Sequence, residues 1–328
     1  MASSLKSAKK MLRDLVCEAA KFGLDVHESK TKVLWNGQGD GTNAKRFTIN
    51  SRQFEILGDS DSTMYLCRLF SFKDHHDTEL KHRVRKAWAK FGVFRNELTN
   101  KCYDLWKRVR LFKSVVQPSF LYGCVSWTLT RAREKLIQTT QRKMLRQILG
   151  VKRLVDDEGV LEEWVDWMVR STGLAEKMAE DLDVPDWTVE VHRRRYQWAA
   201  QVCRRQDERW TLQALTWSVN RSRRRGRPLS RWTDSFFKFF DIVSPHEYIH
   251  NVNTSRHICW MTFAQDEVAW DNLEEDYLNF VLGRWFSPGP SPGPVVEPLC
   301  TSLRVMRVDR TRLSVSVSVL HNFVARNG

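Results

Sequence analysis

The sequence predicts a mainly α protein with a short strand-bearing region near its beginning. Apolar residues recur at helical spacing over much of the 328 residues, and two extended, turn-bounded pieces lie before residue 60. Proline and glycine stand at the ends of several helical stretches. A chain of this length can bury a substantial core, and it allows two or three units of roughly 100–200 residues each.

The first expected helix covers Leu5–Phe22, because apolar residues recur along it at helical spacing and Gly23 stands where a C-terminal cap would be. Two extended pieces follow, Lys32–Trp35 and Arg46–Leu57. The stretch between them, Asn36–Gly41, is rich in turn-forming residues. A hairpin made by the two pieces is the simplest interpretation.

The middle of the chain predicts further helices. In the first of them, Glu79–Leu98, an apolar stripe faces one way and the basic residues, Lys86 and Lys90 among them, lie largely off it. The next covers Asp104–Gln117 and is expected to end there, because Pro118 cannot continue an α-helix.

A third central helix begins after Thr130, which offers an N-cap, and ends at Gly150. Its buried stripe is apolar and its remaining faces are basic. Those faces carry Arg131, Arg133, Lys135, Arg142, Lys143 and Arg146.

The sign of the charge then changes twice along the chain. Residues 151–190 hold twelve acidic residues against four basic ones, and residues 192–231 hold twelve arginines against two acidic residues. Such blocks usually mark different surfaces or modules. After an aromatic helical stretch to about Phe286, Ser287–Pro294 has the composition of a linker, and the last thirty residues could form a strand or a disordered tail. We therefore expect four segments, namely 1–75, 76–150, 151–286 and 287–328.

The composition favours an intracellular protein with an acidic partner. With 53 Lys and Arg against 39 Asp and Glu, the formal charge is +14, and nucleic acid is the commonest partner of such a chain. The seven cysteines are scattered and include no C-x-x-C pair, which fits a reducing compartment. The chain has no secretory h-region and no apolar run of about 18 residues. It is expected to be nuclear or cytoplasmic, not secreted and without a membrane partner, while its oligomeric state is left open.

Four stretches of the sequence, taken in their order along the chain, resemble consecutive parts of one known protein family. They are Phe22–Val33, with Gly-Leu, Lys-Thr and then a strand; Phe54–Gly58; Arg110–Gly150, which opens with Arg-Leu-Phe-Lys-Ser-Val-Val-Gln-Pro-Ser-Phe-Leu-Tyr-Gly; and Arg193–Trp270. In this order they resemble the end of the palm, the primer-grip hairpin, the helical thumb and the segment downstream of it in reverse transcriptases of non-LTR (LINE-type) retrotransposons. Ile56 stands where that family usually has tyrosine.

The resemblance implies a helical thumb-like bundle, preceded by a small α+β palm remnant and followed by a basic, aromatic helical module. It implies RNA-directed DNA synthesis as the activity of the intact enzyme, whose carboxylates hold two Mg²⁺ ions in a palm strand and a Tyr-Ala-Asp-Asp turn. The sequence contains no such turn. The chain is therefore expected to be a fragment that lacks the catalytic aspartates, has no cofactor of its own and is inactive alone.

Two features, one in the palm stretch and one after the primer-grip match, concern the chemistry of the intact enzyme. Lys30 is similar in position to a family lysine that could protonate pyrophosphate, so it is a possible accessory general acid. Asp59 and Asp61 follow the primer-grip match, where metal ligands are not expected, and they are interpreted as a polar turn.

Nucleic-acid contact is expected from basic residues on helix faces, since Arg and Lys can follow a phosphate backbone while apolar stripes pack the bundle. The fourteen tryptophans are interpreted mainly as packing residues, with base stacking open to an exposed few. The expected contact residues are Lys86, Lys90, Arg142, Lys143, Arg146, Arg193, Arg194, Arg195, Arg223, Arg224, Arg225 and Arg227.

One alternative and one motif compete with this interpretation. Arg225-Gly226-Arg227-Pro228 resembles the core of an AT-hook, so the chain could be a basic DNA-binding protein unrelated to polymerases. The stretch His246–His250 matches the H-E-x-x-H zinc motif. Pro245 and a polar sequence after the motif confine any helix there to little more than one turn, which argues against a metalloprotease.

Overall fold

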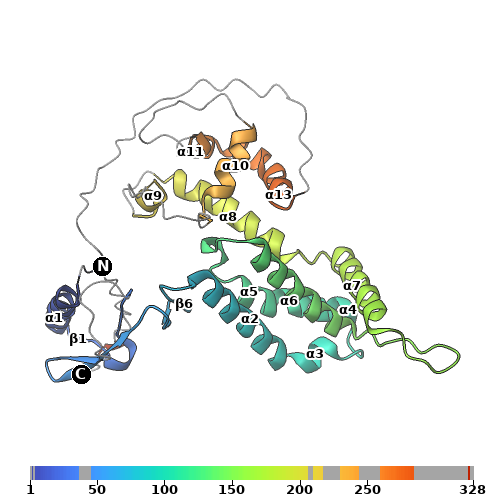
Figure 1. The fold of residues 1–328 in the computed structure, drawn as a ribbon, viewed down its shortest axis with the longest axis horizontal. Helices are drawn as coiled ribbons and strands as arrows, with labels where there is room; N and C mark the ends of the chain where they lie inside the picture. Colours follow the sequence, from blue (N-terminus) through green and yellow to red (C-terminus); the bar gives the residue numbers. More distant parts are fainter. Residues whose placement is uncertain are drawn as a thin grey trace. The chain divides into compact units, whose positions relative to one another are not determined.

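The computed structural model describes residues 2, 4–36, 46–205, 210–216, 230–243, 259–283 and 324–325. Two compact units divide the chain, one of residues 1–82 with 290–328 and one of residues 83–289 (Figure 1). Helices account for most of the described residues, which confirms the predicted mainly α class. None of the described helices is long and apolar enough to cross a membrane.

Helix α1 (Leu5–Lys21) forms the core of the first unit together with a small sheet. The hydroxyl of Ser4 accepts a hydrogen bond from the Ser7 N–H at 3.1 Å and caps the helix, and Gly23 follows its end with φ of +69°. Leu12 is buried against sheet residues. Phe22, counted in the predicted apolar pattern, is 77% exposed because it falls at the C-cap, past the last helical turn.

The central sheet has the order β2 (Lys32–Leu34), β4 (Arg52–Leu57) and β3 (Arg46–Ile49). Strand β2 pairs with β4 in parallel and β3 pairs with β4 antiparallel, so the predicted hairpin between the two extended pieces is wrong. The hairpin forms inside the second piece instead. Asn50 and Ser51 take φ of +48° and +66°, the left-handed values that a two-residue type I′ turn requires.

Short elements complete the first unit. A two-stranded sheet joins β5 (Thr63–Tyr65) to β6 (Arg68–Phe70), and a second one joins β1 (Leu24–Asp25) to β7 (Val324–Ala325). The 3₁₀ turn η1 covers Glu28–Lys30 and leads into β2.

The helix predicted over Glu79–Leu98 is two helices. Helix α2 covers His75–Val93, α3 covers Arg95–Thr99, and the chain breaks at Phe94 between them. The break lets the side chain of Leu98 reach the interior from α3.

The predicted stop at Pro118 is also wrong. Helix α4 (Leu105–Leu111) continues through η2 (Phe112–Val116), a π-helical turn, into α5 (Gln117–Leu121). The Gln117 N–H bonds to the carbonyl of Phe112, five residues back, and Pro118 falls in the first turn of α5. The wider π turn immediately before Pro118 makes room for the proline ring, which in a regular α-helix would clash with the carbonyl four residues back.

Helix α6 (Arg131–Leu149) agrees with its prediction, with Gly150 in the left-handed conformation after its end. Thr130 is the N-cap residue, although its side chain makes no capping hydrogen bond. The other helices of the second unit follow in chain order. They are α7 (Trp164–Asp181), α8 (Trp187–Cys203), α9 (Trp210–Thr216), α10 (Asp234–Val243), α11 (Cys259–Phe263), α12 (Glu267–Asn272) and α13 (Glu274–Val281).

Helix α8 takes part in two aromatic clusters. At its start, Trp187 stacks on Phe120 with 4.3 Å between ring centroids and on Phe112 with 5.6 Å. Farther along, Tyr196 stacks on Trp270 at 4.2 Å, and its hydroxyl donates to the Trp270 carbonyl at 2.7 Å. These tryptophans pack as predicted, whereas Trp164 is 57% exposed.

Candidate nucleic-acid interface

Helix α2 presents cations on its solvent face. Arg85, Lys86 and Lys90 are exposed, while Ala87 and Phe91 on the opposite side are buried. None of the three cations makes an ion pair with a described residue. Lys86 and Lys90 share one side of the helix, because residues four apart lie one above the other, and the helical rise separates them by about 6 Å.

Lys143 of α6 is a further exposed cation beside α2. Its ammonium nitrogen lies 5.7 Å from the centroid of the Trp88 ring, a cation–π contact, and the side chain is exposed. Trp88 is three residues from Arg85 and two from both Lys86 and Lys90, so Lys143 lies toward the Arg85 side of α2 and away from the two lysines. We call Arg85, Lys86 and Lys90 the α2 cation face.

The other predicted cations of α6 hold helices together. Arg142 forms an ion pair with Glu176 of α7 at 2.7 Å, and Arg146 donates to the hydroxyl of Thr172 at 2.8 Å. Burial lowers the pKa of Arg146, and neighbouring Arg142 lowers it further. Both guanidinium groups are therefore engaged in joining α6 to α7.

The arginines of α8 do not form a free basic surface. Arg193 pairs with Glu274 and Glu275, each at 3.0 Å, and Arg194 pairs with Glu190 at 2.6 Å. Arg195 is only 2% exposed, so it is not accessible to a phosphate in this structure. These three consecutive arginines, predicted to contact nucleic acid, point to three sides of α8. Two of them are paired with carboxylates of the same unit, and the third is buried.

Arg195 is buried against Trp232. Its guanidinium donates to the carbonyl of Trp232 at 2.7 Å and lies 5.3 Å from the centroid of that ring. Burial lowers its pKa from the usual arginine value. His192 lies beside it and contacts the Glu134 carboxylate at 3.1 Å.

The remaining predicted positions lie apart from these helices. Lys30 is exposed at the end of η1 in the first unit. After strand β4, the carboxylate of Asp61 accepts a hydrogen bond from the Gly58 N–H at 2.9 Å, which fits the predicted polar turn. Among the described residues, no three His, Cys, Asp or Glu side chains are grouped so as to hold a metal ion. The stretches Arg223–Arg227 and His246–His250 lie outside the described residues.

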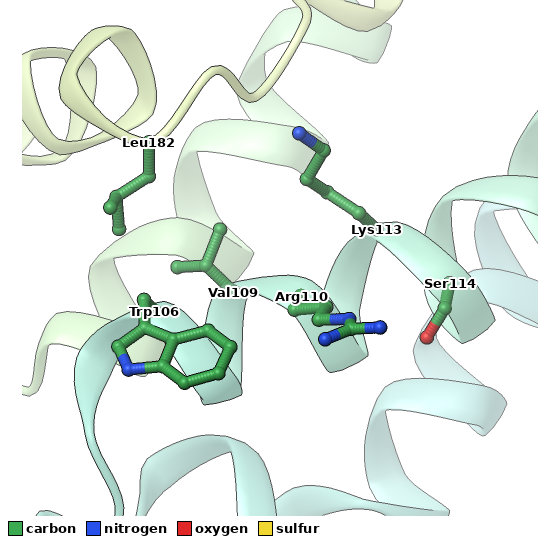
Figure 2. A pocket seen from close by; sticks show the side chains of 6 residues that line it. All are labelled: Trp106, Val109, Arg110, Lys113, Ser114 and Leu182. Atoms are coloured by element: carbon green, nitrogen blue, oxygen red, sulfur yellow. The ribbon is translucent and has the colours of Figure 1, made fainter.

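A hollow of about 370 Å³ lies beside α4 and η2, with Leu182 at the end of α7 as its far wall (Figure 2). Trp106, Val109 and Leu182 form its apolar end, and Arg110, Lys113 and Ser114 form its polar end. We call it the α4 pocket.

The cations of the α4 pocket differ in their surroundings. Arg110 is exposed and pairs with no described acid. Lys113 donates to the backbone carbonyl of Asp183, and the carboxylate of the same residue lies 3.6 Å from its ammonium group. Of the two pocket cations, Arg110 is therefore the one whose charge is not paired with a described carboxylate.

Sequence reasoning missed Arg85 and the α4 pocket. Five pocket residues follow the spacing i, i+3, i+4, i+7 and i+8, which marks one helix face and could have been recognised. Leu182 is distant in the chain, and the predicted stop at Pro118 gave no reason to expect a π turn. The residues on that face are Trp106, Val109, Arg110, Lys113 and Ser114.

The chain is 31% identical over 271 residues to an uncharacterized transposon-derived protein of Caenorhabditis elegans, an alignment that covers 82% of this chain and 89% of the relative. The chain belongs to this transposon-derived family. No family model matches it, and no solved structure matches it. The α2 cation face and the α4 pocket are therefore features of a transposon-derived protein.

Proposed function

We propose that this chain is the nucleic-acid-holding part of a non-LTR retrotransposon reverse transcriptase, corresponding to the end of the palm, the thumb and the downstream segment. The ordered sequence stretches support this proposal, and transposon origin agrees with it. In this role the chain binds a primer–template duplex and does not catalyse DNA synthesis by itself.

The α2 cation face is the observation that carries the proposal. Exposed cations without acidic partners attract phosphates, and their contacts release counterions from the nucleic acid. The rise of about 6 Å between Lys86 and Lys90 spans roughly two phosphates of one strand, which repeat about every 3.4 Å along a duplex axis. Helix α7 has the opposite character, since Asp166, Glu176 and Glu180 are exposed on it. A duplex would therefore follow α2 and avoid α7.

Magnesium is the metal expected for the intact enzyme, but the described residues do not fit such a site. Asp61 uses its carboxylate to close a turn, and no third ligand stands near it among the described residues. Lys30 could serve as a general acid only beside a leaving pyrophosphate, so we assign it no role in this chain alone.

Fluorescence anisotropy with an RNA–DNA hybrid, repeated over a range of salt concentrations, tests the proposal. We expect Lys86→Ala with Lys90→Ala to reduce the slope of log affinity against log salt by about 2, since each lost phosphate contact removes about 0.9. Lys177→Ala, an exposed lysine on acidic α7, is the matched control and should leave the slope unchanged.

Two outcomes would contradict the proposal. An unchanged slope in the double variant would remove the α2 cation face as the contact surface. A strong preference for A·T-rich B-form DNA over the hybrid would favour the AT-hook alternative. In a parallel reaction with primer, template and Mg²⁺ we expect no incorporation, and any incorporation would overturn the statement that the chain is inactive alone.

A further inference from the structure

The α4 pocket has an aromatic, apolar end and a cationic, polar end on the same helix face. Trp106 is 49% exposed and stands beside Val109 and Leu182, while Arg110 and Ser114 lie at the other end (Figure 2). Exposure alone does not mark a site, because Trp164 is also exposed. Trp106 differs because its indole lines a hollow whose opposite end is cationic.

We propose that the α4 pocket binds one unpaired nucleotide, with the base stacked on Trp106 and the phosphate bound by Arg110. Aromatic side chains stack on bases of any sequence, and arginine is suited to phosphate by its planar fork of donors. The volume of about 370 Å³ lies at the lower end of the range of small-molecule pockets. This inference rests on the proposed function and adds a second, single-stranded contact to the duplex contact at α2.

The π turn η2 helps to build the polar end. It contains Lys113 and Ser114, which follow Arg110 at three and four residues and so share its side of the helix. Lys107 lies 5.6 Å from the centroid of the Trp106 ring, but its charge is already paired with the Asp104 carboxylate at 2.9 Å, so Arg110 is the cation assigned to the phosphate.

Asp183 limits the affinity of the pocket. Its carboxylate opposes an incoming phosphate and neutralises Lys113. The residue has φ of +51°, a left-handed conformation in which asparagine is as well tolerated as aspartate. Asp183→Asn therefore removes the charge with the backbone preserved, and we expect tighter binding from it.

The test compares two probes on the full chain, a blunt RNA–DNA hybrid and the same hybrid with one unpaired nucleotide, made in turn as DNA and as RNA. We expect Trp106→Ala and Arg110→Ala each to weaken binding of the unpaired-nucleotide probe about tenfold, with binding of the blunt probe unchanged. Trp106→Phe should retain most of the affinity, and Asp183→Asn should increase it severalfold. Trp164→Ala is the matched control and should alter neither probe.

The outcomes separate this inference from the proposed function. Equal loss on both probes in Trp106→Ala, or no gain in Asp183→Asn, would overturn the pocket assignment. A misfolded variant could mimic a loss but not a gain, so the Asp183 variant keeps the test decisive. If blunt-probe binding depends on Lys86 and Lys90 while Trp106 has no effect, the pocket inference fails and the proposed function stands.

Discussion

Two buried basic residues of α8, Arg195 and His192, have a role that differs from that of the exposed cations. Arg195 holds the carbonyl of Trp232 and stacks on its ring, an arrangement that needs a planar guanidinium and that lysine cannot reproduce. His192 next to it is buried and contacts Glu134. The sequence around these residues reads as a basic patch, whereas the structure uses them to join α8 to its neighbours.

His192 should make stability depend on pH. Its burial, aided by Arg195, lowers the pKa of the imidazole, and the Glu134 carboxylate opposes the shift without reversing it. The native state therefore stays neutral in a range where the unfolded state, with a histidine pKa of about 6.5, binds a proton. The contribution of His192 is complete above about pH 6.5 and falls as the pH decreases below it, by at most about 1.4 kcal/mol per pH unit.

Urea unfolding at several pH values between about 5 and 8 measures this effect. His192→Gln should flatten the dependence below about pH 6.5, because glutamine does not titrate. His75 also has a pKa lowered by burial, so its dependence remains in both proteins and cancels in the difference. Parallel curves for wild type and variant would contradict the assignment.

At the scale of single elements, the segment between α6 and α7 depends on one carboxylate. Glu162 pairs with Arg170 at 2.6 Å, and its backbone carbonyl accepts hydrogen bonds from Arg153. The Leu154 N–H also donates to the Glu162 carboxylate at 3.0 Å. The bonds from Arg170 and Leu154 lower the pKa of Glu162 to about 2.

Glu162→Gln should loosen this segment while the helices stay folded. Neutral glutamine loses the charge-assisted bonds to Arg170, so we expect faster protease cleavage between residues 154 and 161. In the wild-type chain the carboxylate contributes above the unfolded pKa near 4.5, and its contribution is lost as the pH falls through about 2. Glu163→Gln on the exposed neighbouring residue is the control, and equal cleavage rates in the two variants would refute the role of Glu162.

At the scale of the whole molecule, Trp187 joins helices of the second unit through its ring. Its side chain is fully buried and stacked on Phe112 and Phe120, and its backbone N–H donates to the side-chain oxygen of Gln141 at 2.8 Å. Trp187→Ala should cost about 3–5 kcal/mol through the cavity that it leaves. Hydrogen–deuterium exchange should rise in α5, α6 and α8 and stay unchanged in α1 and β4, which belong to the other unit.

Trp164→Ala is the comparison for this experiment, since an exposed side chain away from special contacts changes stability by about 0.5 kcal/mol or less. Exchange that rises equally in both units after Trp187→Ala would show that the two units unfold together, against their separation in the structure.

Local signals predicted the helices well and the pairing of distant segments poorly. The periodicity that ends at Gly150 and the cap at Gly23 identify α6 and α1, because both depend on neighbours within a few residues. The parallel pairing of β2 with β4 joins residues more than twenty positions apart and has no local signature. The π turn Phe112–Val116 likewise has no signature in the apolar pattern, which predicted a helix ending at Pro118.

The candidate site was predictable only in part, for the same reason. Lys86 and Lys90 are off the apolar stripe of their own helix and are exposed as expected. Arg142 and Arg193 are also off such stripes, but acids from other helices reach them. A charge pattern along one helix shows where cations can point, and tertiary contacts decide which of them remain accessible.

The stacking of Trp187 on Phe112 and Phe120 has a practical consequence for the choice of fragments to express. A fragment that ends at Gly150 contains both phenylalanines but not the indole that covers them, so it exposes an aromatic surface and is prone to aggregate. A fragment that begins near Trp187 has the opposite defect, an unpaired indole at its start. Dissection of the helical unit should therefore keep α4 through α13 in one piece.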